Sequence, residues 1–397
     1  MADVSLRPGE KHRRRGLWQN FRTLLRLIRA IDVDELRRLI ARFDERQDQL
    51  EQTQQNLEAS VKEAQSNIHH LLQLFGKIDR ALNSHDPRLA HSGTLNIKNL
   101  WYELGRSLSE RDLTARPRCP HGTRLRSKLC NQADFTTDWF LYWCGEMHIE
   151  PYYHRKFWEL CYIAQALFAE GMLNADRRCI GFGCGEEPLP SLFAKYGVRV
   201  LATDLDPTRP ETYLWRQTNE YAGAVEAIRR PDICPEKELL ANIAFRPVDM
   251  NSLPPELHGQ FDFCWSACAL EHLGSLENGL KFIENSVRTL KAGGVAVHTT
   301  EFTLNDGDTI DHQPTVLFQR QHLEDLANRL RAAGHEVAEF DFDPGQEVLD
   351  RFVDLPPFQG NELISPAHYA HLKLLIDGYA CTSVGIIIKA SSRGDNA

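Results

Sequence analysis

The stretch CIGFGCGEEP at residues 179–188 decides the fold, because it joins an apolar strand candidate to a helix candidate through closely spaced glycines. Glycine lets the backbone turn tightly and approach a ligand where a Cβ atom would clash. Tight strand-to-helix turns are common, so this stretch is weak by itself. About 20 residues later a second strand candidate ends at Asp204, where a carboxylate can accept hydrogen bonds from both hydroxyls of a ribose. We therefore expect Gly181, Gly183, Gly185 and Asp204 to surround a nucleoside.

Strand and helix patterns alternate on both sides of this turn. The strand candidates are 178–182, 199–203, 243–248, 261–266 and 294–300, and the helix candidates include 154–173, 188–196, 276–290 and 320–333. Such alternation predicts βαβ units, that is, a parallel Rossmann-like sheet with helices on both faces. Two later strand candidates, 336–342 and 382–389, would add an antiparallel end and complete a seven-stranded α/β sheet.

The bulk composition is that of a globular chain. Of 397 residues, 42% are hydrophobic and 25% are charged, as in ordinary soluble proteins. The net charge of -9 argues against a nucleic-acid partner, because general nucleic-acid binders carry a basic excess. Ten scattered cysteines suit a reducing cytoplasm better than a disulfide framework. A zinc site at Cys119, His121 and Cys130 would lack a second cysteine pair.

The first 85 residues differ from the rest. Residues 1–32 predict a basic amphipathic helix, which could lie on an anionic membrane surface with Trp18 and Phe21 inserted, or pack inside an oligomer. Residues 33–85 predict an α-helical coiled coil that mediates self-association, with two helices folding back on the globular domain as the alternative. The apolar seam follows alternating steps of four and three residues and comprises Leu36, Ile40, Phe43, Gln47, Leu50, Gln54, Leu57, Val61, Ala64, Ile68, Leu71, Phe75, Ile78 and Leu82.

The remaining boundaries follow from breaks in these patterns. Residues 86–134 read as a linker with short helices, residues 135–390 as the Rossmann-like domain, and residues 391–397 as a disordered tail. We expect a cytoplasmic protein, held peripherally at the inner face of the cell membrane if residues 1–32 bind lipid.

Two acids after the glycines separate two classes of ligand. A dinucleotide needs a helix N-terminus that can meet its pyrophosphate, and Glu186 and Glu187 would repel that group. The same acids suit a cofactor with an ammonium group and a sulfonium cation, although acids also favour any helix N-terminus. This pattern disfavours NAD.

Residues after the next strands agree with a nucleoside site. The third strand candidate leads to Asp249 and Met250, an acid for an adenine amino group and an apolar side chain for its ring. Leu205 follows the second strand, and Ser266 ends the fourth. Ligands of open α/β sheets bind at the carboxyl ends of the strands, where all these residues converge.

At this point the sequence shows a resemblance. From about residue 150 to 390 the chain resembles class I methyltransferases, and more narrowly a bacterial group found with polysaccharide and glycan biosynthesis. The matching stretches are YHRKFWE at 153–159, GFGCGEEPLP at 181–190, ATDLD at 202–206 and SACALEHLG at 266–274. The resemblance implies S-adenosylmethionine as cofactor, held by Gly183, Gly185, Asp204 and Asp249. Many relatives carry an acid where this chain has Gly181, and Glu187 could take over its contact to the cofactor's amino group.

Methyl transfer to a hydroxyl requires in-line positioning and a general base. The candidate bases follow the fourth and fifth strands: His272, Glu271, His298 and Glu301. The acidic loop 305–312 could also hold Mg²⁺, but a solvated loop is the preferred interpretation, and no metal ligands are assigned. Arg155 and Lys156 could reach the cofactor carboxylate or lie on the surface.

The resulting hypothesis is a coiled-coil oligomer whose catalytic domains methylate a hydroxyl of a sugar or glycan intermediate. Methylation of a carboxylate or an amine of another small metabolite is the alternative reaction. A non-catalytic scaffold that binds the cofactor is the alternative outside enzymes.

Overall fold

The computed structural model describes residues 22, 33–82, 87–206, 208, 224–312, 314–358 and 369–392. The basic helix predicted for residues 1–32 lies outside these residues apart from Arg22, and so does most of the predicted tail. The chain divides into two compact units, residues 1–94 and 95–397, which are described separately. No helix in the described ranges combines the length and the apolar character needed to cross a bilayer.

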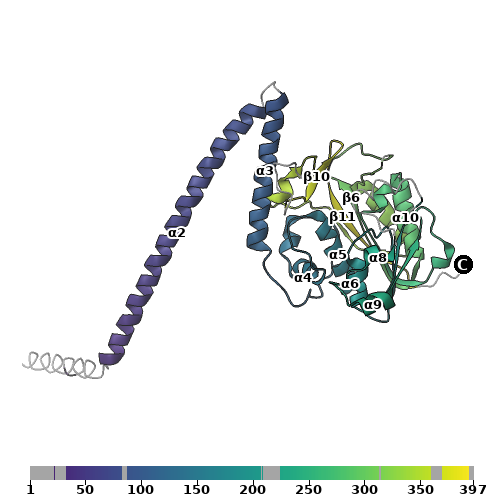
Figure 1. Ribbon diagram of the computed structural model, residues 1–397, viewed down its shortest axis with the longest axis horizontal. Helices are drawn as coiled ribbons and strands as arrows, with labels where there is room; N and C mark the ends of the chain where they lie inside the picture. Colours follow the sequence, from purple (N-terminus) through teal and green to yellow (C-terminus); the bar gives the residue numbers. More distant parts are fainter. Residues whose placement is uncertain are drawn as a thin grey trace, which may run out of the picture. The chain divides into compact units, whose positions relative to one another are not determined.

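The first unit contains one long helix, α2 (Val33–Leu82), of 50 residues (Figure 1). It covers nearly all of the segment predicted as a coiled coil. Seam residues Leu50, Leu57, Val61 and Ile68 are 49 to 69% exposed. The helix is thus confirmed, while its pairing with a second helix stays a prediction.

The second unit is built around a sheet of eleven strands among the described residues, not the seven expected. Its parallel part has the order β4 (Ile243–Pro247), β3 (Arg199–Asp204), β2 (Arg178–Gly181), β5 (Phe261–Ala267) and β6 (Leu290–Thr303). Beside β6 runs β11 (Tyr379–Lys389), which is antiparallel as predicted. The carboxyl ends of the parallel strands therefore meet at one edge, which is where a ligand is expected.

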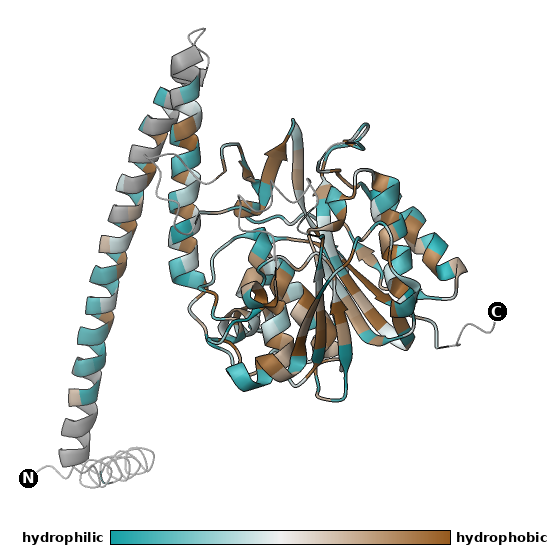
Figure 2. Ribbon diagram, turned by 45° about the vertical axis from the view of Figure 1, so that its right-hand side comes forward, coloured by the Kyte–Doolittle hydropathy of each residue, from teal (hydrophilic) through white to brown (hydrophobic). Residues whose placement is uncertain are grey.

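Helices cover both faces of this sheet (Figure 1). The helices α4 (Asp138–Glu146), α5 (Arg155–Ala169), α6 (Leu189–Lys195) and α9 (Glu236–Asn242) pack with one apolar core. The helices α10 (Leu276–Arg288) and α11 (Arg320–Ala332) pack with the core on the other face. In Figure 2 the strands between these layers are mostly hydrophobic, as expected for a sheet that is buried on both faces.

Short elements account for the difference from the expected strand number. The predicted strand 336–342 is divided into β7 (Glu336–Val337) and β8 (Phe340–Asp341), and three strands were not predicted: β1 (Ser127–Leu129), β9 (Val353–Asp354) and β10 (Lys373–Ile376). The remaining short helices are η1 (Gln132–Thr136), α8 (Val225–Ile228), η2 (Pro255–Leu257), η3 (Leu270–His272) and η4 (Leu349–Arg351). Strands of two to four residues are too short to show a periodic pattern.

The segment 86–134 is more ordered than a linker with short helices. It contains α3 (Pro87–Asp112), a helix of 26 residues, and β1, which pairs with β11. Within the second unit, Tyr102 of α3 donates to both oxygens of Asp354 at 2.9 and 3.0 Å, and Lys98 Nζ lies 3.3 Å from the same carboxylate. His371 Nδ1 lies 2.8 Å from Asp354 Oδ2. These buried contacts attach the middle of α3 to the segment that includes β9.

Candidate functional site

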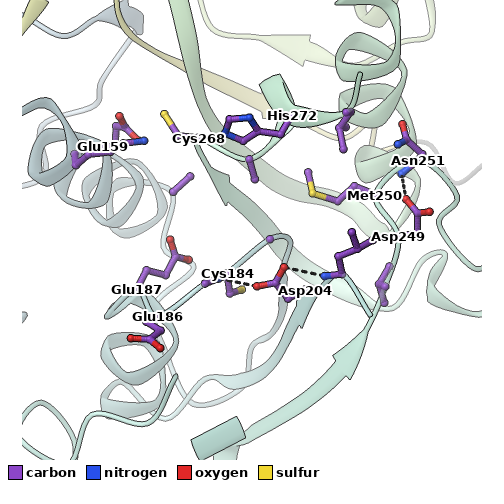
Figure 3. A pocket seen from close by; sticks show the side chains of 18 of the residues that line it. Glu159, Cys184, Glu186, Glu187, Asp204, Asp249, Met250, Asn251, Cys268 and His272 are labelled. Atoms are coloured by element: carbon purple, nitrogen blue, oxygen red, sulfur yellow. Dashed lines mark hydrogen bonds and ion pairs between the residues drawn. The ribbon is translucent and has the colours of Figure 1, made fainter. Parts of the chain in front are cut away.

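A cavity of about 530 Å³ lies at the carboxyl ends of β2, β3, β4 and β5 (Figure 3). Most of its wall comes from the glycine turn after β2, the ends of β3 and β4, the segment after β5, and one face of α5. Its lining residues are Lys156, Glu159, Leu160, Gly183, Cys184, Gly185, Glu186, Glu187, Asp204, Leu205, Val248, Asp249, Met250, Asn251, Ala267, Cys268, Ala269, His272, Leu273 and Gly274.

The turn after β2 requires glycine at residue 183. Its φ is +60°, and a Cβ atom there would lie 2.7 Å from the Cβ of Ala269 and 3.4 Å from Met250 Sδ. The next residue, Cys184, donates its N–H to the carbonyl of Thr203 at 3.0 Å, which ties the turn to β3. The bare backbone of the turn therefore forms part of the cavity wall, as predicted for Gly183 and Gly185.

Asp204 lies at the end of β3 and is held by the backbone. Its Oδ2 accepts from the Gly185 N–H at 3.1 Å and its Oδ1 from the Leu205 N–H at 2.8 Å. A carboxylate offers about four lone-pair positions, so these contacts leave capacity for further donors. The carboxylate is thus fixed in the wall and can still accept from a vicinal diol.

The segment after β4 forms the opposite end of the cavity. Asp249 Oδ1 accepts from the Asn251 N–H at 2.9 Å, and Met250 is buried beside it (Figure 3). The N–H of Val248 donates to the Asp204 carbonyl at 2.8 Å, which fixes this segment against β3. An acid and an apolar thioether side chain therefore lie together, as the sequence predicted.

Gly181 has a different role from the one predicted. It does not line the cavity; a Cβ atom on it would overlap the Trp265 ring. The indole of Trp265 donates to Glu187 Oε1 at 2.6 Å. The missing side chain at residue 181 thus makes room for Trp265, and Trp265 holds Glu187 in the wall.

The pKa of Glu187 is raised above the usual value for a glutamate. Burial raises its pKa to about 8, helped by Asp204 and Glu159 and opposed by the Trp265 hydrogen bond and Lys156. The side chain is therefore mostly protonated at neutral pH while the cavity is empty. A cation bound beside it would favour the carboxylate form and lower this pKa.

We expect the affinity for S-adenosylmethionine to rise with pH. If the cofactor's ammonium group binds Glu187, binding must release the proton from a carboxyl whose pKa is about 8. The dissociation constant should then fall about tenfold between pH 6 and pH 7, where the α-amino group of the cofactor remains cationic. Calorimetry at both pH values measures this change.

The matched control is Glu187→Gln, which replaces the carboxyl with an amide whose oxygen can still accept from the Trp265 indole but which cannot titrate. Its dissociation constant should vary much less over the same interval. Equal pH dependence in both proteins would show that the cofactor's cation does not bind at Glu187.

The remaining wall contains Lys156, Glu159, Cys268 and His272. His272 Nδ1 lies 2.7 Å from the carbonyl oxygen of Pro314. A carbonyl only accepts, so Nδ1 must carry the proton in neutral imidazole, and Nε2 is then the basic nitrogen. His272 is the one predicted base that lines the cavity.

His298 and Ser266 lie elsewhere. His298 is fully buried, with Nδ1 2.8 Å from Ser266 Oγ and Nε2 3.0 Å from Ser286 Oγ of α10. Burial lowers the pKa of His298 to about 3, so the ring stays neutral. Because strand side chains alternate between faces, His298 points to the α10 side of β6, and its prediction as a base is wrong. Ser266 binds this histidine and does not line the cavity.

Glu271 and Glu301 are also behind the wall. Glu301 Oε1 lies 2.6 Å from Arg155 Nη2, and Glu271 Oε2 accepts from Thr300 Oγ1 at 3.0 Å. Arg155 further contacts Glu159 at 3.2 Å. Glu301 is thus part of a buried ion-pair network with Arg155 and Glu159, and Glu271 is buried beside Thr300. Arg155 belongs to this network rather than to the surface or the cofactor.

One group of potential metal ligands occurs among the described residues. Ligand atoms of Cys268, Glu271 and Glu301 lie within 4.8 Å of one another. Arg155 Nη1 lies 3.7 Å from Cys268 Sγ and its Nη2 contacts Glu301, so a guanidinium already supplies positive charge there and would repel a dication. In the acidic loop, Asp311 accepts from the Leu276 N–H at 2.6 Å, which stabilises the start of α10.

Several lining residues were not singled out in the sequence. Glu159 lies on α5 four residues after Arg155, and Cys268 follows β5 with a φ of +44°. A carboxylate one turn from two basic residues, inside a stretch that matched the family, was the available signal for Glu159. The sequence gives no comparable signal for Cys184 or Cys268, because scattered cysteines in apolar runs are usually core.

Comparison with known families agrees with this site. Residues 180–298 match a family model described as a methyltransferase domain, a segment that holds the glycine turn, Asp204, Asp249 and His272. The matched segment is a methyltransferase domain. A comparison with curated proteins finds no match.

Solved structures resemble the methyltransferase domain in fold only. A protein from Galdieria sulphuraria, described provisionally as a sarcosine dimethylglycine methyltransferase, is 18% identical over 59% of this chain and 84% of its own, with a TM-score of 0.37. A SAM-dependent methyltransferase from Aquifex aeolicus is 15% identical over 56% and 87%, with a TM-score of 0.29. Phosphoethanolamine N-methyltransferase 2 of Haemonchus contortus is 19% identical over 43% of this chain and 36% of its own, with a TM-score of 0.30. None of these likenesses identifies an acceptor.

Proposed function

We propose that this protein transfers the methyl group of S-adenosylmethionine to a hydroxyl of a sugar or glycan intermediate. The proposal of a hydroxyl acceptor rests on His272, whose Nδ1 lies 2.7 Å from the Pro314 carbonyl oxygen. This contact presents a basic Nε2 in a histidine that lines the cofactor cavity. The proposal that the acceptor is a sugar rests on the resemblance of residues 153–159 and 266–274 to the glycan-associated group.

The cavity's charges support a cationic cofactor. Acids in its lining are Glu159, Glu186, Glu187, Asp204 and Asp249, whereas Lys156 is the only basic side chain besides His272 among the described lining residues. We assign Asp204 to the ribose hydroxyls, with Leu205 beside it, and Asp249 with Met250 to the adenine. Glu187 would bind the amino group and Lys156 the carboxylate of the methionine part.

The bound cofactor supplies an electrophilic methyl group on its sulfonium. The protein holds the acceptor oxygen in line with that methyl and excludes water. His272 Nε2 accepts the hydroxyl proton as the carbon–oxygen bond forms and the sulfur–carbon bond breaks. The Pro314 carbonyl stabilises the resulting imidazolium, because it accepts from Nδ1–H in both protonation states.

The acidic side chains of the cavity favour an amine acceptor over a carboxylate acceptor as the alternative to a hydroxyl. The acidic side chains of the lining, Glu159, Asp204 and Asp249, disfavour a carboxylate acceptor and favour an amine acceptor in its ammonium form. Amine methylation is therefore the second candidate reaction. A scaffold that binds the cofactor without turnover remains the candidate outside enzymes.

Calorimetry followed by a turnover assay tests the proposal. If the protein does not bind S-adenosylmethionine, every methyltransferase function proposed for this site is wrong. Release of S-adenosylhomocysteine with sugar or nucleotide-sugar hydroxyl acceptors supports the proposal, and release with amines alone replaces the acceptor class. If the cofactor binds but neither the hydroxyl acceptors nor the amine acceptors are methylated, the protein is better described as a cofactor-binding scaffold.

A further inference from the structure

The long helix α2 carries an exposed stripe whose composition specifies a partner. The residues of α2 whose burial is described are 41–42, 45–62, 64–66, 68–69, 72–73 and 76–77, and all of them except the half-buried Gly76 are exposed. Leu50, Leu57, Val61 and Ile68 are exposed apolar residues on one stripe, and a further exposed leucine, Leu72, lies beside it. The seam positions 47, 50, 54, 57, 61, 64 and 68 are separated by alternating steps of three and four residues. A helix with such a stripe in water is stabilised by burying it against another helix with the same repeat.

We propose that this stripe pairs with the same stripe of a second copy of the chain, as a parallel, in-register, two-stranded coiled coil. In heptad notation, Gln47, Gln54, Val61 and Ile68 occupy a positions, and Leu50, Leu57 and Ala64 occupy d positions. β-branched residues at a with leucine at d favour parallel dimers over trimers and tetramers.

The flanking charges select the parallel orientation. In a parallel pair each g residue faces the e residue five positions later on the other helix, which places Arg46 opposite Glu51. The next such pairs, Thr53 with Glu58 and Ser60 with Gln65, contain no like charges. In an antiparallel pair e residues face e residues, so Glu51 and Glu58 of both chains would share one flank without a cation at the described e positions.

The two glutamines in the seam strengthen the choice of register. Gln47 Nε2 donates to Glu51 Oε1 at 3.3 Å and Gln54 Nε2 donates to Glu58 Oε1 at 2.9 Å within the same helix. Each amide is thereby oriented, and its carbonyl oxygen can accept from the glutamine at the same position of the other helix. A shift of one heptad would pair Gln47 of one chain with Gln54 of the other, but it would place the remaining two glutamines opposite Ile40 and Val61. Each of these glutamines would then be a buried polar group without a partner. Polar a residues are the best-attested device for fixing register and strand number.

Cysteine cross-linking in the full-length protein tests partner, orientation and register together. Gln47→Cys and Ile68→Cys are made separately in a Cys119→Ser background, because Cys119 is the one exposed native cysteine. These positions lie about 31 Å apart along the helix, at 1.5 Å per residue. Under copper-phenanthroline oxidation each variant should form a disulfide-linked dimer with itself, whereas Gln55→Cys, on the outer face, should cross-link at least tenfold less.

Two outcomes would overturn the proposal. Cross-linking of Gln47→Cys only to a tagged Ile68→Cys chain, and not to itself, would show an antiparallel pair. Light scattering at micromolar concentration measures the mass of the wild-type protein. A mass of one chain, about 45.4 kDa, or of three chains would show that the protein is not a dimer.

A charge in the seam checks that the same stripe holds the dimer. Leu57→Asp with Val61→Asp should give the monomer mass, while Ala59→Asp on the outer face should keep the dimer. Cofactor affinity per chain should be the same in all three proteins, which shows that the catalytic domain is folded. A dimer that survives the seam substitutions would contradict the proposal.

Discussion

Replacing His272 by alanine should lower kcat by about 10²–10⁴-fold and leave the dissociation constant of S-adenosylmethionine within about twofold. The imidazole lines the cavity beside Cys268 and Ala269, and its Nδ1 contact to Pro314 makes Nε2 the proton acceptor. Removing it takes away the base but none of the groups assigned to the cofactor. Steady-state kinetics with a hydroxyl acceptor and calorimetry with the cofactor measure the two quantities.

The matched control for this substitution is His258→Ala, an exposed histidine outside the cavity. It should change neither kcat nor cofactor affinity. If His272→Ala instead weakens cofactor binding and leaves kcat unchanged, His272 positions the segment after β5 and another group accepts the proton.

The second large effect concerns Asp204. Asp204→Ala should weaken binding of S-adenosylmethionine by about 1–3 kcal/mol, which corresponds to roughly five- to 150-fold in the dissociation constant. The substitution removes the acceptor for the ribose hydroxyls and leaves the Gly185 N–H without its carboxylate partner. Calorimetry measures the change directly.

Asp206→Ala is the control, because Asp206 is an exposed acid two residues later that does not line the cavity. It should bind the cofactor as the wild type does. An unchanged dissociation constant in Asp204→Ala would mean that the nucleoside occupies another part of the protein.

The central sheet could be predicted because its strands are strongly patterned. The strands β2 to β6 and β11 are apolar on both faces and separated by amphipathic helices, so their positions were predicted to within a few residues. The two-residue strands β7 and β8 were predicted as one strand, because seven residues of mixed character do not reveal a break. The helix α3 was predicted as part of a linker, because His91-Ser92-Gly93 suggested a break that tertiary contacts of Lys98 and Tyr102 override.

The positions of the residues assigned to the cofactor could be predicted from the sequence, whereas those of the candidate bases could be predicted only in part. Gly183, Gly185, Asp204 and Asp249 directly follow strands of known direction, which places them at one edge of the sheet. The choice among bases depends on which face of β6 each side chain occupies and on a partner far away in sequence. Arg155, whose guanidinium binds Glu301, lies 146 positions earlier in the chain, a pairing that no local pattern reveals.

The buried Arg155 network has a consequence for engineering this domain. Arg155 contacts Glu159, Glu301 and Ser383, and so joins α5, β6 and β11 beneath the cavity. Changing a charged member strands a charge without its counterpart, and the same holds for Lys156, whose Nζ lies 3.8 Å from Glu159 Oε2. The apolar lining residues Leu160 and Leu273 can be exchanged without that cost. Directed evolution toward new acceptors should therefore accumulate replacements among the apolar lining residues and retain Arg155, Glu159 and Glu301.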